Sequence, residues 1–173
     1  MTERFEIKTD IQKTNSILTL MAITWEIKSF NKFSPEELYK IFNLRMAVFV
    51  VEQKAAYQDA DGKDLKSDHI MGYNKTGDLI AYSRIIPAGI AFKEISIGRV
   101  VTSQQGRRTG AGRELMKKSI EFIEKKYGAV PIRIGAQCYL INFYSGFGFE
   151  VASGEYIEDC ILHVEMLRSA SKN

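Results

Sequence analysis

The chain has few of the residues that build a disulfide-stabilised or membrane-embedded protein. Its 173 residues include only two cysteines, three prolines and two histidines. Cys138 and Cys160 form no CxxC pair, so the sequence predicts free thiols in a reducing compartment. No apolar run is long enough to cross a bilayer, and "SILTLMAI" is too short and poorly flanked for a secretory signal. We therefore expect a cytoplasmic protein with no membrane partner.

The chain also lacks a strong charge of one sign. Its net charge is +3, and Lys and Arg are interleaved with Asp and Glu rather than gathered in a basic stripe. This pattern argues against nucleic acid as a partner. Hydrophobic residues make up 45% and charged residues 26% of the chain, as in ordinary soluble domains. The length is most simply one domain that needs no disulfide or metal.

The first residues of the chain carry no clear periodicity. We treat residues 1–22 as an N-terminal extension and residues 23–173 as the domain, because "AITWEIKSF" after Met21 already supplies a first strand. Two interpretations of the extension stay open. It is either flexible or mis-assigned sequence before a start at Met21, or an extra strand or helix packed on the core.

The remaining pattern predicts a mixed α/β (α+β) domain with one central sheet. A helix is expected over residues 34–53, where Ser34, Pro35 and Glu37 form a capping box with proline in the first turn. A second, amphipathic helix is expected over residues 112–128. A short aromatic helix is expected in residues 140–149. Strands are expected within residues 22–30, 69–73, 79–87, 94–103, 130–136 and 160–168, with a hairpin turn at Gly77.

One strand-to-helix junction carries an unusual mixture of charge and glycine. In "VVTSQQGRRTGAGREL", Arg107 and Arg108 precede Gly110 and Gly112 at the start of the second helix. A glycine turn at a helix N-terminus exposes backbone N–H groups, and the arginines add full positive charge, so the junction suits a phosphate group. It is neither a P-loop nor a dinucleotide fingerprint. The alternative is a glycine turn whose arginines are merely solvated.

Several ordered motifs resemble the GCN5-related N-acetyltransferase (GNAT) superfamily. R-x-x-G-x-G spans 107–112, and "NFYSGFGF" is similar to the F-Y-x-x-x-G-F segment of the family. Segments 44–53, 57–64, 97–100 and 135–144 resemble the ElaA-like branch. Together these motifs cover roughly residues 25–168.

The resemblance implies a GNAT fold, with a twisted, mostly antiparallel sheet, a splayed parallel pair of strands and helices on both faces. It implies acetyl-CoA as co-substrate and no metal. The strand end at Val100 would hold the pantetheine arm and supply an oxyanion N–H, the loop from Arg107 would hold the pyrophosphate, and Tyr144 would protonate the leaving thiolate. Gln137 stands where the family commonly has Asn. The expected CoA-binding residues are Val100, Val101, Thr102, Arg107, Arg108, Thr109, Gly110, Ala111, Gly112, Arg113, Gln137, Asn142 and Tyr144.

The sequence leaves the general base open. Glu52 and His69 are the catalytic candidates beside Tyr144, because a carboxylate or an imidazole can take a proton from an amine. The alternatives are a solvated carboxylate at a helix end and a structural histidine in a strand. His163 is a candidate for contact with the acceptor.

Three arginines on or beside apolar elements complete the predicted site. Arg45, Arg84 and Arg99 either recognise an anionic group on the acceptor or form salt bridges with the acidic loop "DADGKD". We reject calcium binding by this loop, because Tyr57 and Asp68 occupy the first and twelfth positions of the EF-hand pattern.

The sequence therefore predicts an acetyl-CoA-dependent N-acetyltransferase with a small-molecule or peptide amine as acceptor, acting as a monomer or homodimer. Two alternatives stay open. The enzyme could resemble acyl-homoserine-lactone synthases, which share the fold and a similar Arg–Phe–Asp–Arg set but lack the R-x-x-G-x-G loop. It could also be an acyl-CoA-binding sensor with little turnover.

Overall fold

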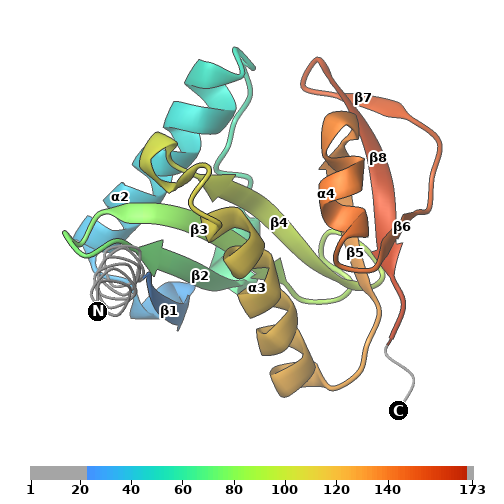
Figure 1. Ribbon diagram of the computed structural model, residues 1–173, viewed down its shortest axis with the longest axis horizontal. Coiled ribbons are helices and arrows are strands. Elements are labelled where there is room, and N and C mark those ends of the chain that lie inside the picture. The colour runs from blue at the N-terminus through green and yellow to red at the C-terminus, as the bar shows by residue number, and fades with distance from the viewer. Residues whose placement is uncertain (1–22, 171–173) are drawn as a thin grey trace, which may run out of the picture.

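The computed structural model describes residues 23–170, which form one open sheet of eight strands with helices on both faces (Figure 1). The strand order is β1-β2-β3-β4-β5-β8-β6, with β7 paired to β8. All pairs are antiparallel except β4–β5. The strands are β1 (Thr24–Ser29), β2 (Asp68–Tyr73), β3 (Leu79–Ile86), β4 (Ile95–Thr102), β5 (Ile132–Gln137), β6 (Phe149–Val151), β7 (Tyr156–Glu158) and β8 (Ile161–Arg168). This is the GNAT fold that the motifs implied.

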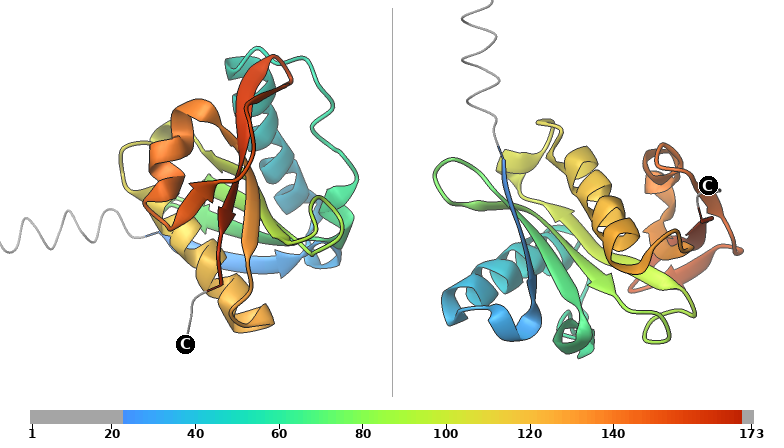
Figure 2. Two further views of the ribbon diagram at one scale, coloured as in Figure 1. Left: turned by 90° about the vertical axis from the view of Figure 1, so that its right-hand side faces the viewer. Right: turned by 90° about the horizontal axis from the view of Figure 1, so that it is seen from below.

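Two helices cover opposite faces of the β1–β4 half of the sheet (Figure 2). Helix α2 (Pro35–Arg45) lies on one face and α3 (Ala111–Tyr127) on the other, while the short α4 (Ile141–Ser145) follows β5. The predicted capping box of α2 is present, with the Ser34 hydroxyl accepting from the Glu37 N–H. Gly128 ends α3 as expected.

The period of two in the strands divides the core between the two faces. Ile70 and Ala81 pack toward α3 with Leu115 and Ile123, whereas their neighbours Met71 and Tyr82 pack toward α2. All six side chains are essentially inaccessible to solvent. The sheet is therefore fixed from both sides, because a one-residue slip would exchange its two faces.

The parallel strands β4 and β5 pair only at one end. Their register includes Ile95 opposite Ile132 and Ser96 opposite Arg133, after which the strands separate. Arg133 holds this closed end together, since its guanidinium binds both carboxylate oxygens of Glu94 at 2.8 Å and Glu165 at 2.9 Å. The strands therefore form a V whose open end lies toward α4 and the N-terminus of α3.

The first predicted helix is shorter than expected. It is α-helical only to Arg45, and Met46–Glu52 continues as a π-helix with i→i+5 bonds such as Gln53 N–H to Val48 O at 3.1 Å. The β-branched residues of "VFVV" crowd a regular α-helical turn, which fits the wider winding. The sequence pattern also missed β6 and β7, which have three residues each.

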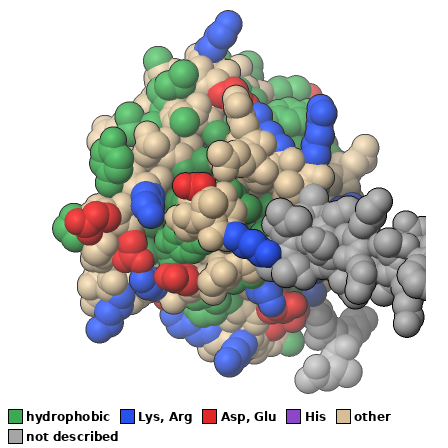
Figure 3. Space-filling model, turned by 60° about the vertical axis from the view of Figure 1, so that its left-hand side comes forward, with side chains coloured by type: hydrophobic (Ala, Val, Ile, Leu, Met, Phe, Trp, Pro, Cys, Tyr) green, Lys and Arg blue, Asp and Glu red, His purple; other side chains and the backbone are tan. Residues whose placement is uncertain are grey.

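The expectations for residues 1–22 lie outside the described residues. Within residues 23–170, no helix is long and apolar enough to span a membrane. Basic and acidic side chains are interspersed on the face that Figure 3 shows, without a large field of one sign.

Candidate active site

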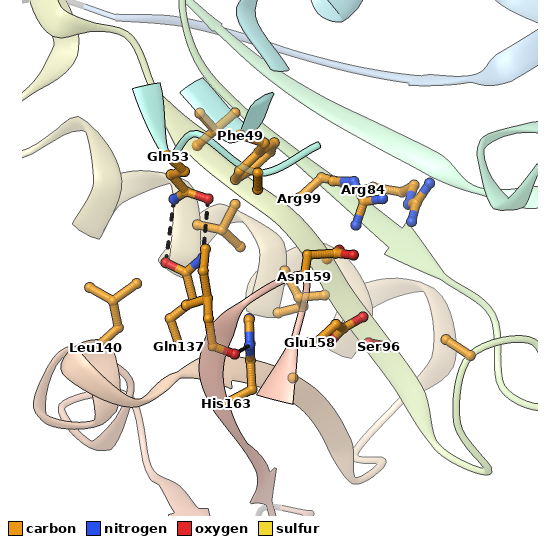
Figure 4. Close-up of a pocket in the computed structure, with 18 of the residues that line it drawn as sticks. Phe49, Gln53, Arg84, Ser96, Arg99, Gln137, Leu140, Glu158, Asp159 and His163 are labelled. Carbon is orange, nitrogen blue, oxygen red and sulfur yellow. Dashed lines mark hydrogen bonds between the residues drawn. The ribbon is translucent and has the colours of Figure 1, made fainter. Parts of the chain in front are cut away.

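A cleft of about 950 Å³ follows the V between β4 and β5. One wall comes from β4 and the π-helix, and the opposite wall from β5, α4, β7 and β8 (Figure 4). Predicted site residues that line the cleft are Glu52, Arg84, Arg99, Val100, Val101, Thr102, Arg107, Gln137, Tyr144 and His163. The fold thus brings together segments that are up to about a hundred residues apart in the sequence.

A bulge in β4 shapes the first wall. Tyr82 pairs with Val101 and Arg84 with Gly98, so two steps along β3 match three along β4. Arg99 and Val100 lie between these two pairs of residues, and the φ of Arg99 is 53°. A bulge leaves a backbone group without a ladder partner. Here the two residues at the bulge, Arg99 and Val100, both line the cleft.

The R-x-x-G-x-G loop lies at the open end of the V. Arg108 and Gly110 have φ of 61° and 90°, which lets the chain reverse into α3. The Thr109 hydroxyl accepts from the Ala111 N–H at 3.3 Å, and the first helical bond is Glu114 N–H to Gly110 O. Within the described residues, no hydrogen bond uses the N–H groups of Gly112 or Arg113. These free N–H groups at a helix start can bind an anion.

The same loop packs directly beside α4. A Cβ placed on Gly112 would lie 4.0 Å from Cζ of Phe143, and the Arg113 guanidinium sits 5.7 Å from the Phe147 ring centroid. The phosphate-type loop and the F-Y segment, predicted separately, are therefore neighbours. Asn142 and residues 108–113 lie outside the lining of the cleft itself.

Tyr144 occupies the α4 side of the cleft. Its ring packs edge-on against Phe143 and Phe149, at centroid distances of 5.1 and 6.2 Å. The side chain is 6% exposed, and none of the hydrogen bonds found among residues 23–170 involves its hydroxyl. Burial raises the pKa of Tyr144, so the phenol keeps its proton at neutral pH. The geometry thus presents a protonated hydroxyl to the cleft.

The three predicted arginines and three aspartates alternate in a closed ring. Arg45 binds Asp59 and Asp64 at 2.8 Å, and Arg84 binds Asp61 at 2.7 Å and Asp64 at 3.0 Å. Arg99 completes the ring with Asp59 at 2.7 Å and Asp61 at 3.5 Å. Within the ring, each charge therefore has two partners of opposite sign. The ring joins α2, β3 and the β4 bulge to the loop before β2.

This arrangement corrects the prediction that Arg45 contacts the acceptor. Arg45 has no accessible surface and does not line the cleft, because it is enclosed by Asp59, Asp64 and the rings of Phe42 and Tyr82. Arg84 and Arg99 do line the cleft, but their charges are already neutralised by the aspartates. The salt-bridge alternative thus describes their geometry.

His69 also lies in the interior rather than in the cleft. It is 2% exposed, with Nδ1 2.7 Å from the Tyr82 hydroxyl and Nε2 3.1 Å from the Asp64 carbonyl. Burial lowers the pKa of His69, so the ring stays neutral and joins the Arg–Asp ring to β3. Its predicted role as catalytic base is therefore corrected to a structural one, because no substrate reaches the imidazole.

Glu52 lies at the exposed mouth of the cleft and is already paired. Its carboxylate binds the guanidinium of Arg107 at 2.8 Å. The pair joins the π-helix to the R-x-x-G-x-G loop. An incoming phosphate would compete with Glu52 for Arg107.

Two residues that sequence reasoning missed contact predicted site residues in the cleft. Gln53 and Gln137 exchange amide hydrogen bonds of 3.4 and 3.2 Å, which Figure 4 shows bridging the two walls. Tyr156 stacks on His163 with centroids 5.8 Å apart. Neither Gln53 nor Tyr156 belongs to a motif with its own chemistry, so only the fold could place them. Among the described residues no cluster of metal-binding side chains is present.

Comparison with known proteins supports the GNAT resemblance that the motifs indicated. Residues 29–169 match the model of the acetyltransferase (GNAT) domain. Protein ElaA of Escherichia coli K12 is 40% identical over 84% of this chain and 96% of its own length. UPF0039 protein C11D3.02c of Schizosaccharomyces pombe is 41% identical over 80% of this chain and 92% of its own.

Solved structures agree with the sequence relatives. An acyl-CoA N-acyltransferase from Pseudomonas aeruginosa superposes with a TM-score of 0.81 at 35% identity, covering 86% of this chain and all of that one. The crystal structure of E. coli ElaA gives 0.79 at 38% identity with the same coverage. An aminoglycoside 6′-N-acetyltransferase complexed with coenzyme A shares the fold, with a TM-score of 0.63 at 13% identity over 86% of this chain and 98% of that one. The chain belongs to the GNAT acetyltransferase family, and proteins of the ElaA type are among its relatives.

Proposed function

We propose that this protein is an acetyl-CoA-dependent N-acetyltransferase that transfers the acetyl group directly to a primary amine in the β4–β5 cleft. The observation that carries the proposal is the cleft itself. It joins a bulged strand and a protonated tyrosine hydroxyl in one continuous space, and a helix N-terminus with free N–H groups lies beside it. The acyl-CoA N-acyltransferase of P. aeruginosa, similar over its whole length, supports the same chemistry.

The cofactor would lie along the open V. Its pyrophosphate would accept from the N–H groups of Gly112 and Arg113, with Arg107 and Arg108 adding positive charge. Its pantetheine arm would follow Val100 to Thr102, where the bulge offers an N–H to the thioester carbonyl as an oxyanion site does. Gln137 is bonded to Gln53 and Tyr139, so pantetheine contact there requires this bridge to open.

Tyr144 would be the general acid. When the amine has attacked the carbonyl carbon and the C–S bond breaks, the phenol gives its proton to the CoA thiolate. Its ring packs against Phe143 and Phe149, which fixes the position of the hydroxyl. The assignments to the cytoplasm and to a monomer or homodimer stay predictions from the sequence.

The test is a transfer screen with acetyl-CoA and four amine classes: alkylamines, polyamines, amino-sugar phosphates and peptide N-termini. Release of the CoA thiol together with the mass of an acetylated amine is expected for at least one class. Thiol release without an acetylated product would indicate hydrolysis instead. Acetyl-CoA binding without transfer to any amine would favour the sensor alternative and contradict the proposal.

A further inference from the structure

His163 occupies a position in the cleft that the acetyl-transfer chemistry above does not use. In β8 alternate residues face opposite ways, so Val164 and Met166 enter the core while His163 and Glu165 face the cleft. His163 also pairs in register with Gln137 of β5 and Tyr156 of β7. It therefore stands on the wall opposite the β4 bulge.

The surroundings of His163 fix which ring nitrogen carries the proton. Nδ1 lies 2.8 Å from the carbonyl oxygen of Ile161. A carbonyl can only accept, so Nδ1 must donate, and in the neutral ring Nε2 is left with a free lone pair. No hydrogen bond within residues 23–170 uses Nε2. The imidazole is thus prepared to accept a proton.

The ring is also held in orientation. It stacks on Tyr156 with an angle of 26° between the ring planes. A Cβ on Gly135 would lie 3.1 Å from the Tyr156 hydroxyl, so the bare backbone of β5 makes room for that tyrosine. Figure 4 shows His163 below Gln137, on the side of Glu158 and Asp159. A rigid, half-buried imidazole beside open carboxylates suits an arriving ammonium group.

We propose that His163 is the general base of the reaction and accepts at Nε2 the proton that the acceptor's ammonium group must lose. This inference rests on the proposed function. Of the other groups considered, His69 is enclosed and Glu165 is bound by Arg133, while Glu52 lies at the exposed mouth of the cleft beside Arg107.

The protons balance in this scheme. The ammonium gives one proton to His163, which passes it to solvent, and the nitrogen lone pair forms the C–N bond. After collapse of the tetrahedral intermediate, the C–S bonding electrons leave with sulfur, which takes the proton of Tyr144. The second nitrogen proton restores the phenol, and the third stays on the amide. The products are the acetylated amine, CoA thiol and one released proton.

The test compares His163→Asn with the unaltered chain, using the alkylamine that supports the fastest transfer in the screen. Asparagine can keep the amide N–H near Nδ1 that donates to Ile161, but it has no equivalent of Nε2. We expect single-turnover acetyl transfer to slow by roughly 10²–10⁴-fold, with acetyl-CoA affinity and melting temperature retained. Free imidazole should restore part of the rate to His163→Ala.

Two readouts separate a base from a merely structural histidine. Hydroxylamine is unprotonated at neutral pH, so its acetylation should depend much less on His163 than that of the alkylamine. The acid limb of the kcat/KM profile should disappear in His163→Asn. It should persist in Glu158→Gln, which removes a neighbouring carboxylate. The titratable and charged groups that line this part of the cleft beside His163 are Tyr156, Glu158, Asp159, Glu165, Tyr139 and Arg99.

The tautomer offers a test that needs no activity. With only two histidines in the chain, ¹⁵N spectra of the imidazoles can be assigned by comparison with His163→Asn. A proton on Nδ1 and none on Nε2 of neutral His163 is expected, and the reverse would overturn the proposal. An unchanged transfer rate in His163→Asn would overturn the role of His163 alone. Absence of transfer to any amine by the unaltered chain would overturn the proposed function and this role together.

Discussion

At the scale of single residues, each aspartate of the Arg–Asp ring is shared by two arginines. Asp64 is 4% exposed and binds Arg45 and Arg84, so Asp64→Asn leaves two buried cations short of a partner. Breaking a buried ion pair typically costs about 3–5 kcal/mol. We expect a loss of this size in the free energy of unfolding, measured in urea at pH 7. Glu121→Gln, which breaks the exposed Lys118–Glu121 pair, should cost at most about 0.5 kcal/mol. Equal urea midpoints for the two variants would contradict the structural role of the ring.

The ring also predicts a pH dependence. Burial alone would raise the pKa of Asp61 and Asp64, but the guanidiniums of Arg84 and Arg45 outweigh it and hold both pKa values below their ordinary range. A carboxyl with a lowered pKa in the folded state stabilises the protein above its unfolded pKa of about 3.9. That stabilisation is lost as the pH falls through the lowered folded values. In Asp64→Asn the loss of stability below pH ~4 should be shallower, because one such carboxyl is missing.

The type of a residue did not by itself indicate whether its role is structural or chemical. His69 and His163 both lie in strands of similar pattern, yet one is enclosed by Tyr82 and Asp64 while the other faces the cleft. The burial of a strand residue depends on which elements cover that face of the sheet. The sequence around a single histidine does not indicate whether its side chain will be covered. The arginines show the same limit. The sequence suggested that they could bind the acidic loop, but it could not distinguish these salt bridges from recognition of an anionic group on the acceptor.

At the scale of elements, the turn from β4 into α3 depends on close backbone approach. A Cβ on Gly106 would lie 2.5 Å from the carbonyl oxygen of Ile80, which accepts from the Ser103 N–H. Gly106→Ala must displace this turn, which leads directly into Arg107. We expect a destabilisation of about 1–3 kcal/mol together with weaker acetyl-CoA binding by calorimetry.

Gly154→Ala is the matched control for that change. A Cβ there meets no atom within 4 Å, so stability and acetyl-CoA affinity should stay near those of the unaltered chain. If Gly106→Ala behaved like Gly154→Ala, the turn would have room that the structure does not give it.

Elements with strong periodicity or caps were predictable. The start of α2, the end of α3 and the β2–β3 hairpin follow from the Ser34 capping box, Gly128 and Gly77 respectively. The sequence pattern predicted one continuous helix over residues 34–53 and did not show the change to π-helical bonds at Met46. The three-residue strands β6 and β7 carry too few residues to show a period, and they exist because β8 offers both of them a partner.

At the scale of the whole molecule, the first strand that the structure describes is β1, which begins at Thr24, and the family match begins at residue 29. We therefore expect a chain starting at Met21 to retain the melting temperature and acetyl-CoA affinity of the full chain. Thermal unfolding and calorimetry on the two chains provide the check. A drop of several degrees in the shorter chain would mean that residues 1–20 pack on the domain.

The fold was predictable because several motifs occur along the chain in the order that one known fold requires. The strand end, the R-x-x-G-x-G loop and the F-Y segment all lie along the V, as their family resemblance implied. The far wall was not predictable, because it depends on the β7–β8 hairpin folding back over Gly135. Tyr156 reaches the cleft only through that long-range packing.

The most direct test of acetyl transfer in this cleft is the single-turnover rate of Tyr144→Phe, measured beside its acetyl-CoA affinity. The substitution removes one hydroxyl and almost no volume, so the ring should still pack against Phe143 and Phe149 and the fold should survive. We expect the transfer step to slow by roughly 10²–10⁴-fold while acetyl-CoA affinity changes little, because the phosphate contacts lie at the α3 N-terminus. A full single-turnover rate in Tyr144→Phe would contradict the account and remove Tyr144 from the chemistry.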